Sequence, residues 1–124
     1  MRNIALRRGQ RRFRENLLSV YGRQCCVTGT GSEAVLEAAH IQPYSSEGTD
    51  ELRNGLLLRS DIHVFFDLNL LSIDPATEKD FCSKQIRRVP PYDQLHGKKA
   101  SFPRGIERRP DFDTLKAHFD GTRD

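Results

Sequence analysis

The first part of the chain has the periodicity of an amphipathic helix. Between Arg7 and Tyr21 the large apolar residues recur at helical spacing, so they share one face while arginines surround the other. These apolar residues are Phe13, Leu17, Leu18 and Tyr21. Gly22 follows at once, and glycine is typical of the position that ends a helix. We therefore predict a helix over residues 7–21 with one apolar face and one basic face.

Short apolar runs separated by polar loops follow in the middle of the chain. Residues 34–41 are predicted to form a short, largely buried strand that carries His40 near its end. Residues 42–53 have the composition of a loop. The dipeptide Asn54-Gly55 predicts a tight turn, after which residues 56–58 form a three-leucine strand.

The remaining elements are a helix, a hairpin and a closing helix. Ser60 is predicted to cap a helix that ends near Leu68, with Asp61 in the first turn, where the helix dipole favours an acid. Two strand-like runs, residues 70–74 and 79–83, flank a turn sequence and predict a hairpin. Residues 111–119 have helical spacing. We expect one α+β domain that spans residues 1–124.

Charge is distributed unevenly along this chain. The net charge is only +3, but residues 1–23 contain seven arginines and one acid, Glu15, so that segment alone carries +6. Clustered guanidinium groups match the geometry of phosphates and suit a polyanionic partner such as nucleic acid. The same cluster is also what a solvated helix face looks like, so charge alone leaves both interpretations open.

Cysteine content and hydropathy indicate the cellular compartment in which the protein is expected to work. Cys25, Cys26 and Cys82 are an odd number and lack C-x-x-C spacing, which argues against a disulfide framework and against a zinc site built from cysteine pairs. No apolar run approaches 18 residues, and no leader with a cleavage site is visible. We expect a cytoplasmic protein with reduced thiols and no membrane association.

The centre of the chain combines a strand, a loop, a strand and a helix with a polar residue at each junction. His40 ends the first strand, Asn54 lies between the strands and His63 lies on the helix, at separations of 14 and 9 residues. This ββα unit resembles the His-Asn-His (HNH) endonucleases, also called ββα-metal nucleases. The resemblance implies a ββα-metal core flanked by the N-terminal basic helix and by the C-terminal hairpin and helix.

The resemblance covers nearly the whole chain and is tightest between residues 36 and 73. Along its length the chain is also similar to the HNH subfamily found in many bacterial restriction and defence proteins. The segments that carry this similarity are Arg8 to Arg14, Leu17-Leu18, Tyr21-Gly22, Cys25 to Gly29, Leu57 to His63, Phe66-Asp67 and Leu115 to His118. It implies an endonuclease that hydrolyses DNA phosphodiester bonds with low sequence specificity.

The resemblance gives each motif residue a role in hydrolysis. His40 would be the general base that takes a proton from the attacking water, a task for which imidazole is suited near neutral pH. His63 and Asp67 lie four residues apart on the predicted helix, so both can reach one cation. A divalent metal is implied, with Mg²⁺ as first choice and Mn²⁺, Ni²⁺ or Zn²⁺ as alternatives. Asn54 would fix the loop that positions the base, although Asn-Gly also forms turns for purely structural reasons.

This chain departs from the family at one position. Many HNH enzymes have a metal-binding His or Asp directly before the base, and here that residue is Ala39. Glu37 is a candidate replacement, but three residues from His40 on a strand it faces the opposite side, so we expect it to pair with an arginine or to orient His40. The alternative to a nuclease is therefore a catalytically inactive DNA-binding or scaffolding module with the same fold.

The basic residues predict how DNA would be bound. Arg8, Arg11 and Arg12 of the first helix, together with Arg59, are predicted to contact backbone phosphates and so to position a duplex without reading its bases. No zinc finger, RNA-recognition motif or homeodomain pattern is present in the sequence. Target choice would then come from a partner protein or domain, and a homodimer is also possible.

Overall fold

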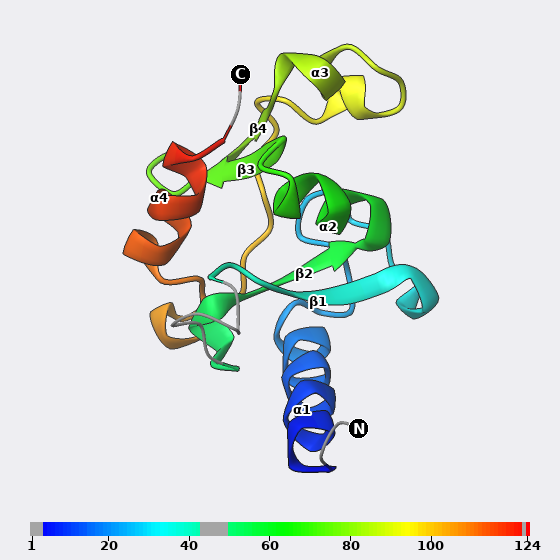
Figure 1. Ribbon diagram of the computed structural model, residues 1–124, viewed down its shortest axis with the longest axis vertical. Coiled ribbons are helices and arrows are strands. Elements are labelled where there is room, and N and C mark those ends of the chain that lie inside the picture. The colour runs from blue at the N-terminus through cyan, green and yellow to red at the C-terminus, as the bar shows by residue number, and fades with distance from the viewer. Residues whose placement is uncertain (1–3, 43–49, 123) are drawn as a thin grey trace.

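The computed structural model describes residues 4–42, 50–122 and 124. Within them, two antiparallel hairpins form separate sheets against which the helices pack (Figure 1). The helices are α1 (Ile4–Val20), α2 (Ser60–Asp67), α3 (Lys84–Arg87) and α4 (Phe112–Asp120), and the strands are β1 (Leu36–His40), β2 (Gly55–Arg59), β3 (Leu71–Asp74) and β4 (Lys79–Cys82). The predicted α+β class, with a ββα unit followed by a hairpin and a helix, is confirmed.

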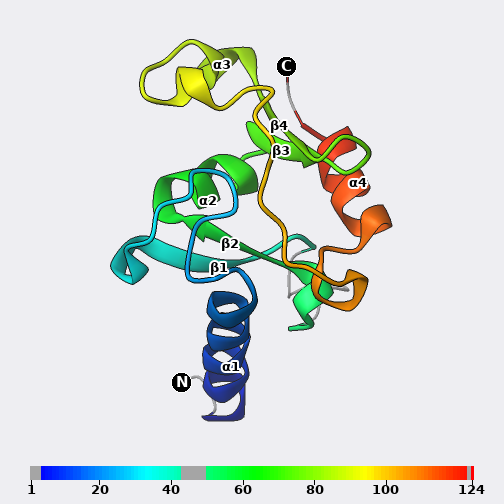
Figure 2. The same ribbon diagram turned by 180° about the vertical axis from the view of Figure 1, so that it is seen from behind.

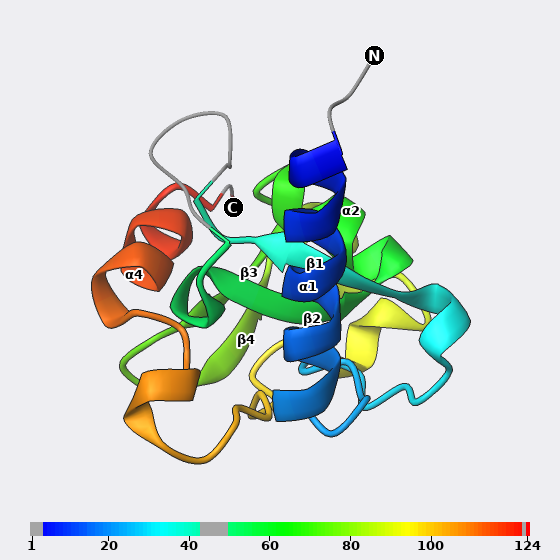
Figure 3. The same ribbon diagram turned by 90° about the horizontal axis from the view of Figure 1, so that it is seen from below.

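The β1–β2 hairpin lies between two helices. Helix α1 packs on one face and α2 on the other, as the views in Figures 1 and 3 show. Strand β2 is covered on both faces, which is why its three leucines, Leu56 to Leu58, are all 0% exposed. Strand β1 has a partner along one edge within the described residues, and its polar side chains Glu37 and His40 reach solvent. Strand β2 therefore anchors the hairpin in the core, and the polar side chains that solvent can reach come from β1.

Helix α1 has the apolar face that the sequence predicts. Phe13, Leu17, Leu18 and Tyr21 are all buried in the core. The helix begins at Ile4, three residues before the predicted start, and ends at Val20, one residue before the predicted end. Gly22 follows with a φ of 64°, the left-handed conformation expected after a helix end. The amide of Arg23 then donates to the Leu18 carbonyl at 2.8 Å and closes the helix end.

The Asn54-Gly55 dipeptide does not form the tight turn predicted for it. Asn54 ends a 3₁₀ turn, and Gly55 is extended, with φ −129° and ψ 148°, and begins β2 opposite His40. A Cβ at Gly55 would lie 2.8 Å from Phe13 Cζ and 2.9 Å from both δ carbons of Leu17. The glycine is therefore required by the close approach of α1.

Gly55→Ala is expected to destabilise the fold by about 1–3 kcal/mol, because the added methyl group must displace packed side chains of α1. Gly31→Ala is the matched control, since a Cβ there meets only the Arg23 carbonyl oxygen, at 3.9 Å. Chemical denaturation of both variants measures the difference. Equal stability of the two variants would show that α1 does not approach the hairpin this closely.

The β3–β4 hairpin lies between α2 and the closing helix α4. Strand β3 contacts both helices, and Figure 2 shows the hairpin between them from behind. His118 of α4 stacks on Phe66 of α2 with ring centroids 3.6 Å apart, its Nε2 lies 2.7 Å from the Phe66 carbonyl oxygen, and its Nδ1 lies 2.6 Å from Ser72 Oγ. This histidine therefore fixes the C-terminal end of α2 in place.

Among the described residues, no helix is both long enough and apolar enough to cross a membrane.

Candidate active site

His40 lies at the end of β1, against helix α1. Its ring stacks on Phe13 with centroids 4.4 Å apart and planes 11° from parallel. The close packing of Phe13 on Gly55, the strand partner of His40, makes this stack possible. The imidazole Nε2 lies 2.8 Å from Asp50 Oδ1, and the two side chains are 21% and 25% exposed. His40 is thus held by an aromatic ring and by a carboxylate while remaining accessible to water.

Asn54 ties down the chain immediately after His40. Its side-chain Oδ1 accepts from the Gln42 amide at 2.9 Å, and its Nδ2 donates to the Gln42 carbonyl at 3.0 Å. The Asn54 carbonyl accepts from the Ile41 amide at 2.9 Å. Three hydrogen bonds from one buried residue therefore fix the two residues that follow His40. Holding the base-bearing segment is the duty that the family resemblance implies for this asparagine.

His63 lies on α2 between two carboxylates. Its Nδ1 is 2.7 Å from Glu37 Oε1 on β1, and its Nε2 is 3.2 Å from Asp67 Oδ2 one helical turn later. The expectation that Glu37 pairs with an arginine or orients His40 was therefore wrong. Glu37 faces α2, because it lies on the opposite side of β1 from His40, and α2 places His63 on that side. The predicted proximity of His63 and Asp67 is present in the structure.

The surroundings of His63 suit a divalent cation. A neutral imidazole has one N–H and one lone pair, so with a carboxylate at each nitrogen the lone pair faces an oxygen. A second proton or a bound cation at that nitrogen removes this conflict. Among the described residues, no group of three or more His, Cys, Asp or Glu side chains is placed so that it could hold a metal ion. The donor set, one imidazole with one carboxylate, instead fits an ion that keeps several waters and also binds substrate phosphate.

A groove along the exposed edge of β1 is lined by His40 and also by Glu37, the partner of His63. Its volume is 410 Å³ and its lining residues are Gln10, Phe13, Arg14, Leu36, Glu37, Ala38 and His40. Glu37 and His40 stand three residues apart, about 10 Å of extended strand. The groove therefore opens onto the predicted base, onto the carboxylate that holds His63, and onto the basic helix α1. A bound phosphodiester and the water that attacks it would have to lie between His40 and His63.

The predicted DNA-binding arginines lie in different environments. Arg11 and Arg12 are exposed on α1. The side chain of Arg8 lies outside the described residues. Arg59 is used internally: its guanidinium donates to both oxygens of Asp61, at 2.7 and 3.0 Å, and to Thr30 Oγ1 at 3.1 Å. All three guanidinium nitrogens thus contact protein groups, which gives Arg59 a structural role, and its phosphate contact stays a prediction.

Asp61 is the centre of this structural network. Besides Arg59, it accepts from the Tyr92 hydroxyl at 2.8 Å and from the Ile62 amide at 3.0 Å. The hydrogen bond from Arg59 is the main reason that the pKa of Asp61 lies below its ordinary value. The cap predicted at Ser60 was wrong, because Ser60 is already helical and Arg59 occupies the cap position without a side-chain hydrogen bond. Asp61 therefore secures the start of α2, the helix that carries His63.

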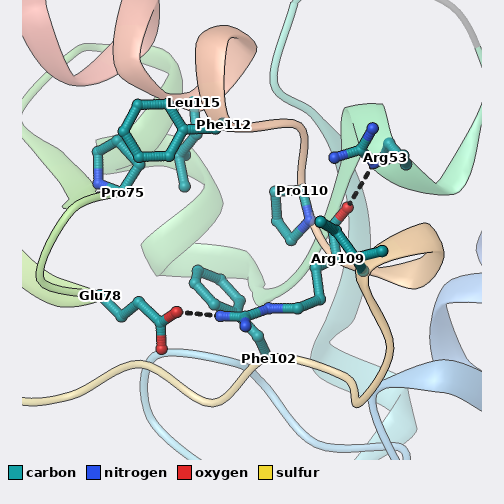
Figure 4. A pocket seen from close by; sticks show the side chains of 9 residues that line it. Arg53, Pro75, Glu78, Phe102, Arg109, Pro110, Phe112 and Leu115 are labelled. Carbon is teal, nitrogen blue, oxygen red and sulfur yellow. Dashed lines mark hydrogen bonds and ion pairs between the residues drawn. The ribbon is translucent and has the colours of Figure 1, made fainter.

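A second hollow lies away from these residues, beside the 3₁₀ turn Leu52–Asn54 (Figure 4). It has a volume of 160 Å³ and is lined by Arg53, Pro75, Glu78, Phe102, Ile106, Arg109, Pro110, Phe112 and Leu115. Arg109 pairs with Glu78 and lies over the Phe102 ring, and Arg53 Nε donates to the Arg109 carbonyl at 3.4 Å. None of the described side chains predicted for catalysis or metal binding lines this hollow.

Sequence reasoning missed two contacts of the candidate site. Asp50 lies in a polar stretch without periodicity, and no signal there singles it out. Strand alternation turns Glu37 away from His40, and that face of β1 is the one covered by the helix that carries His63. Combining the strand alternation with the helix position would have identified the Glu37–His63 contact.

Comparisons with known proteins agree with this geometry. Residues 25–74 match the family model of the HNH endonucleases, a range that includes His40, Asn54 and His63. No curated protein sequence matches the chain. A solved structure, the "Modification dependent TagI restriction endonuclease", superposes with a TM-score of 0.57 at 21% identity and covers 84% of this chain. The matched region is 35% of that longer chain, and at this identity the likeness shows the fold.

Residues 25–74, which contain the ββα unit, are therefore those of an HNH endonuclease, a class of phosphodiester hydrolase. The predicted family and enzyme class are confirmed.

Proposed function

We propose that this chain hydrolyses DNA phosphodiester bonds in a metal-dependent reaction with low sequence specificity. The observation that carries the proposal is the groove along β1, onto which both His40 and Glu37, the partner of His63, open. It is bordered by α1, whose exposed Arg11 and Arg12 would bind backbone phosphates without reading bases. Arg8 of the same helix is predicted to take part in this contact.

His40, Asn54, His63 and Asp67 would divide the reaction between them. His40 takes a proton from the water that attacks phosphorus, and Asn54 keeps the segment after His40 in place. His63 and Asp67 would hold the divalent ion, with His63 binding it through Nε2, because the carboxylate contact at Nε2 is longer than the one at Nδ1. The Nδ1–H group of His63 would donate to Glu37, as the second ring nitrogen of metal-binding histidines commonly does. The bound ion, Mg²⁺ or alternatively Mn²⁺, Ni²⁺ or Zn²⁺, would supply positive charge that stabilises the phosphate and the leaving oxygen.

The structurally similar TagI protein suggests a biological setting. It is described as a restriction endonuclease that depends on modification, and the present chain corresponds to about a third of it. We propose a role in restriction or phage defence, in which a partner protein, a further domain or a second copy of this chain selects the target. The cytoplasmic location stays a prediction from cysteine usage.

The second candidate function is an inactive DNA-binding module with the HNH fold. It is favoured by Ala39, which is 0% exposed and occupies the position where many relatives have a metal ligand. Such a module would retain the arginines of α1 and the stacked His40 but would not turn over substrate.

Supercoiled plasmid incubated with the purified protein and Mg²⁺, Mn²⁺, Ni²⁺, Zn²⁺ or EDTA distinguishes these functions. The nuclease produces nicked or linear DNA with at least one metal and none with EDTA. A binding measurement on the same samples completes the test, because DNA that is bound and left intact with every metal would establish the inactive module.

A further inference from the structure

The His40 imidazole is restrained in two independent ways. Phe13 lies parallel to the ring and so fixes the plane of the imidazole. Asp50 Oδ1 lies 2.8 Å from Nε2 and so fixes the rotation of the ring within that plane. Because the end of β1 is itself held by Asn54, the direction in which the other ring nitrogen, Nδ1, points is also set.

The chemistry of the contact determines which nitrogen carries the proton. An ionised carboxylate only accepts hydrogen bonds, so Nε2 must be the donor. In the neutral imidazole a proton on Nε2 leaves the lone pair on Nδ1. A carboxylate beside the N–H also stabilises the imidazolium that forms once the ring has accepted a second proton.

We infer that Asp50 is a positioning residue, which holds His40 in the Nε2–H tautomer so that Nδ1 takes the proton from water. This inference rests on the proposed nuclease function. In the step, a water proton moves to Nδ1, the water oxygen forms a bond to phosphorus, and the bond from phosphorus to the leaving oxygen breaks. The leaving oxygen then takes a proton from solvent and the imidazolium returns one, so that the atoms and charges balance.

Asp50→Asn tests this role, because a side-chain amide can donate to Nε2 and thereby favour the opposite tautomer. Two-bond ¹H–¹⁵N correlation spectra report the tautomer directly, and His40→Ala identifies which of the four histidine signals belongs to His40. We expect the Nε2–H pattern in the wild type and its loss in Asp50→Asn. Asp50→Glu, which keeps the carboxylate, should restore the wild-type pattern at least in part.

Cleavage kinetics provide the second measurement. The cleavage rate of Asp50→Asn at saturating DNA and metal should fall roughly 10²- to 10⁴-fold, the range associated with a misplaced proton on a catalytic histidine. Affinity for DNA and the melting temperature should be unchanged. Asp93→Asn, at an exposed carboxylate, is the control variant.

Two results would overturn the inference: a His40 that keeps the Nε2–H tautomer in Asp50→Asn, or a variant that cleaves at the wild-type rate. A wild type that cuts nothing refutes the proposed nuclease function instead. The spectra separate these failures, because the tautomer can be read without turnover, and a tautomer change in Asp50→Asn would still establish the pairing.

Discussion

His63→Ala is expected to weaken Mn²⁺ binding at least about 100-fold and to abolish metal-dependent cleavage. Loss of a group that merely supports a metal ligand costs about 10- to 100-fold in affinity, so loss of the ligand itself should cost no less. Titration of the protein with Mn²⁺, followed by the EPR signal of the free ion, measures the change. His96→Ala is the matched control, because it removes an exposed imidazole far along the chain from the motif.

Two further variants show which nitrogen of His63 faces the ion. If the metal lies at Nε2, Asp67→Asn should reduce Mn²⁺ affinity more than Glu37→Gln, because Asp67 is then a ligand and Glu37 orients the ring. The reverse order would place the ion at Nδ1 between β1 and α2. If His63→Ala leaves the Mn²⁺ affinity unchanged, His63 is not a metal ligand and the metal site does not include α2.

Asp80→Asn is expected to make the protein more stable than the wild type at alkaline pH. Asp80 of β4 is 2% exposed, and within the described residues neither of its carboxyl oxygens has a hydrogen-bond partner. Burial raises the pKa of this carboxyl from 3.8 to about 8, against a smaller opposing effect of Lys98. At neutral pH the folded protein therefore carries Asp80 in its protonated form.

The direction of the pH dependence follows from proton binding. Between pH 4 and pH 8 the folded state keeps the proton and the unfolded state loses it, so the free energy of unfolding falls by up to about 1.4 kcal/mol per pH unit. Above pH 8 both states are ionised and this contribution no longer changes. The asparagine variant cannot lose the proton, so from pH 5 to pH 8 it should gain up to about 4 kcal/mol relative to the wild type.

Urea denaturation at several pH values tests this expectation. Asp93→Asn, which alters an exposed carboxylate, should follow the wild-type curve. Parallel curves for wild type and Asp80→Asn would mean that Asp80 is ionised in the folded protein.

The sequence predicted those features that depend on local pattern. The apolar face of α1, the glycine that ends it and the leucine run of β2 follow from periodicity and composition, and the spacing of His40, Asn54 and His63 indicated the family. Gly55 shows where such reasoning fails. The Asn-Gly pair has a strong turn preference, but packing of Phe13 and Leu17 against the glycine decided its extended conformation.

The contacts of the candidate site depend on tertiary placement. Ala39 and Glu37 are two residues apart on β1, so both lie on the face that α2 covers. Glu37 therefore reaches His63 from the same face on which many HNH enzymes have a metal ligand, at the position that Ala39 occupies here. Arg59 is basic and close to the motif, yet its neighbour Asp61 binds its guanidinium. Neither pairing follows from charge or spacing alone, because each needs the relative position of two elements.

The most direct test of the account is the single-turnover rate of DNA cleavage by His40→Ala at saturating Mn²⁺. General base catalysis contributes about 10²- to 10⁴-fold, so we predict a decrease of that size with unchanged affinity for DNA and for Mn²⁺. Wild-type cleavage by His40→Ala would contradict the account, because the proton of the attacking water would then be taken by some other group.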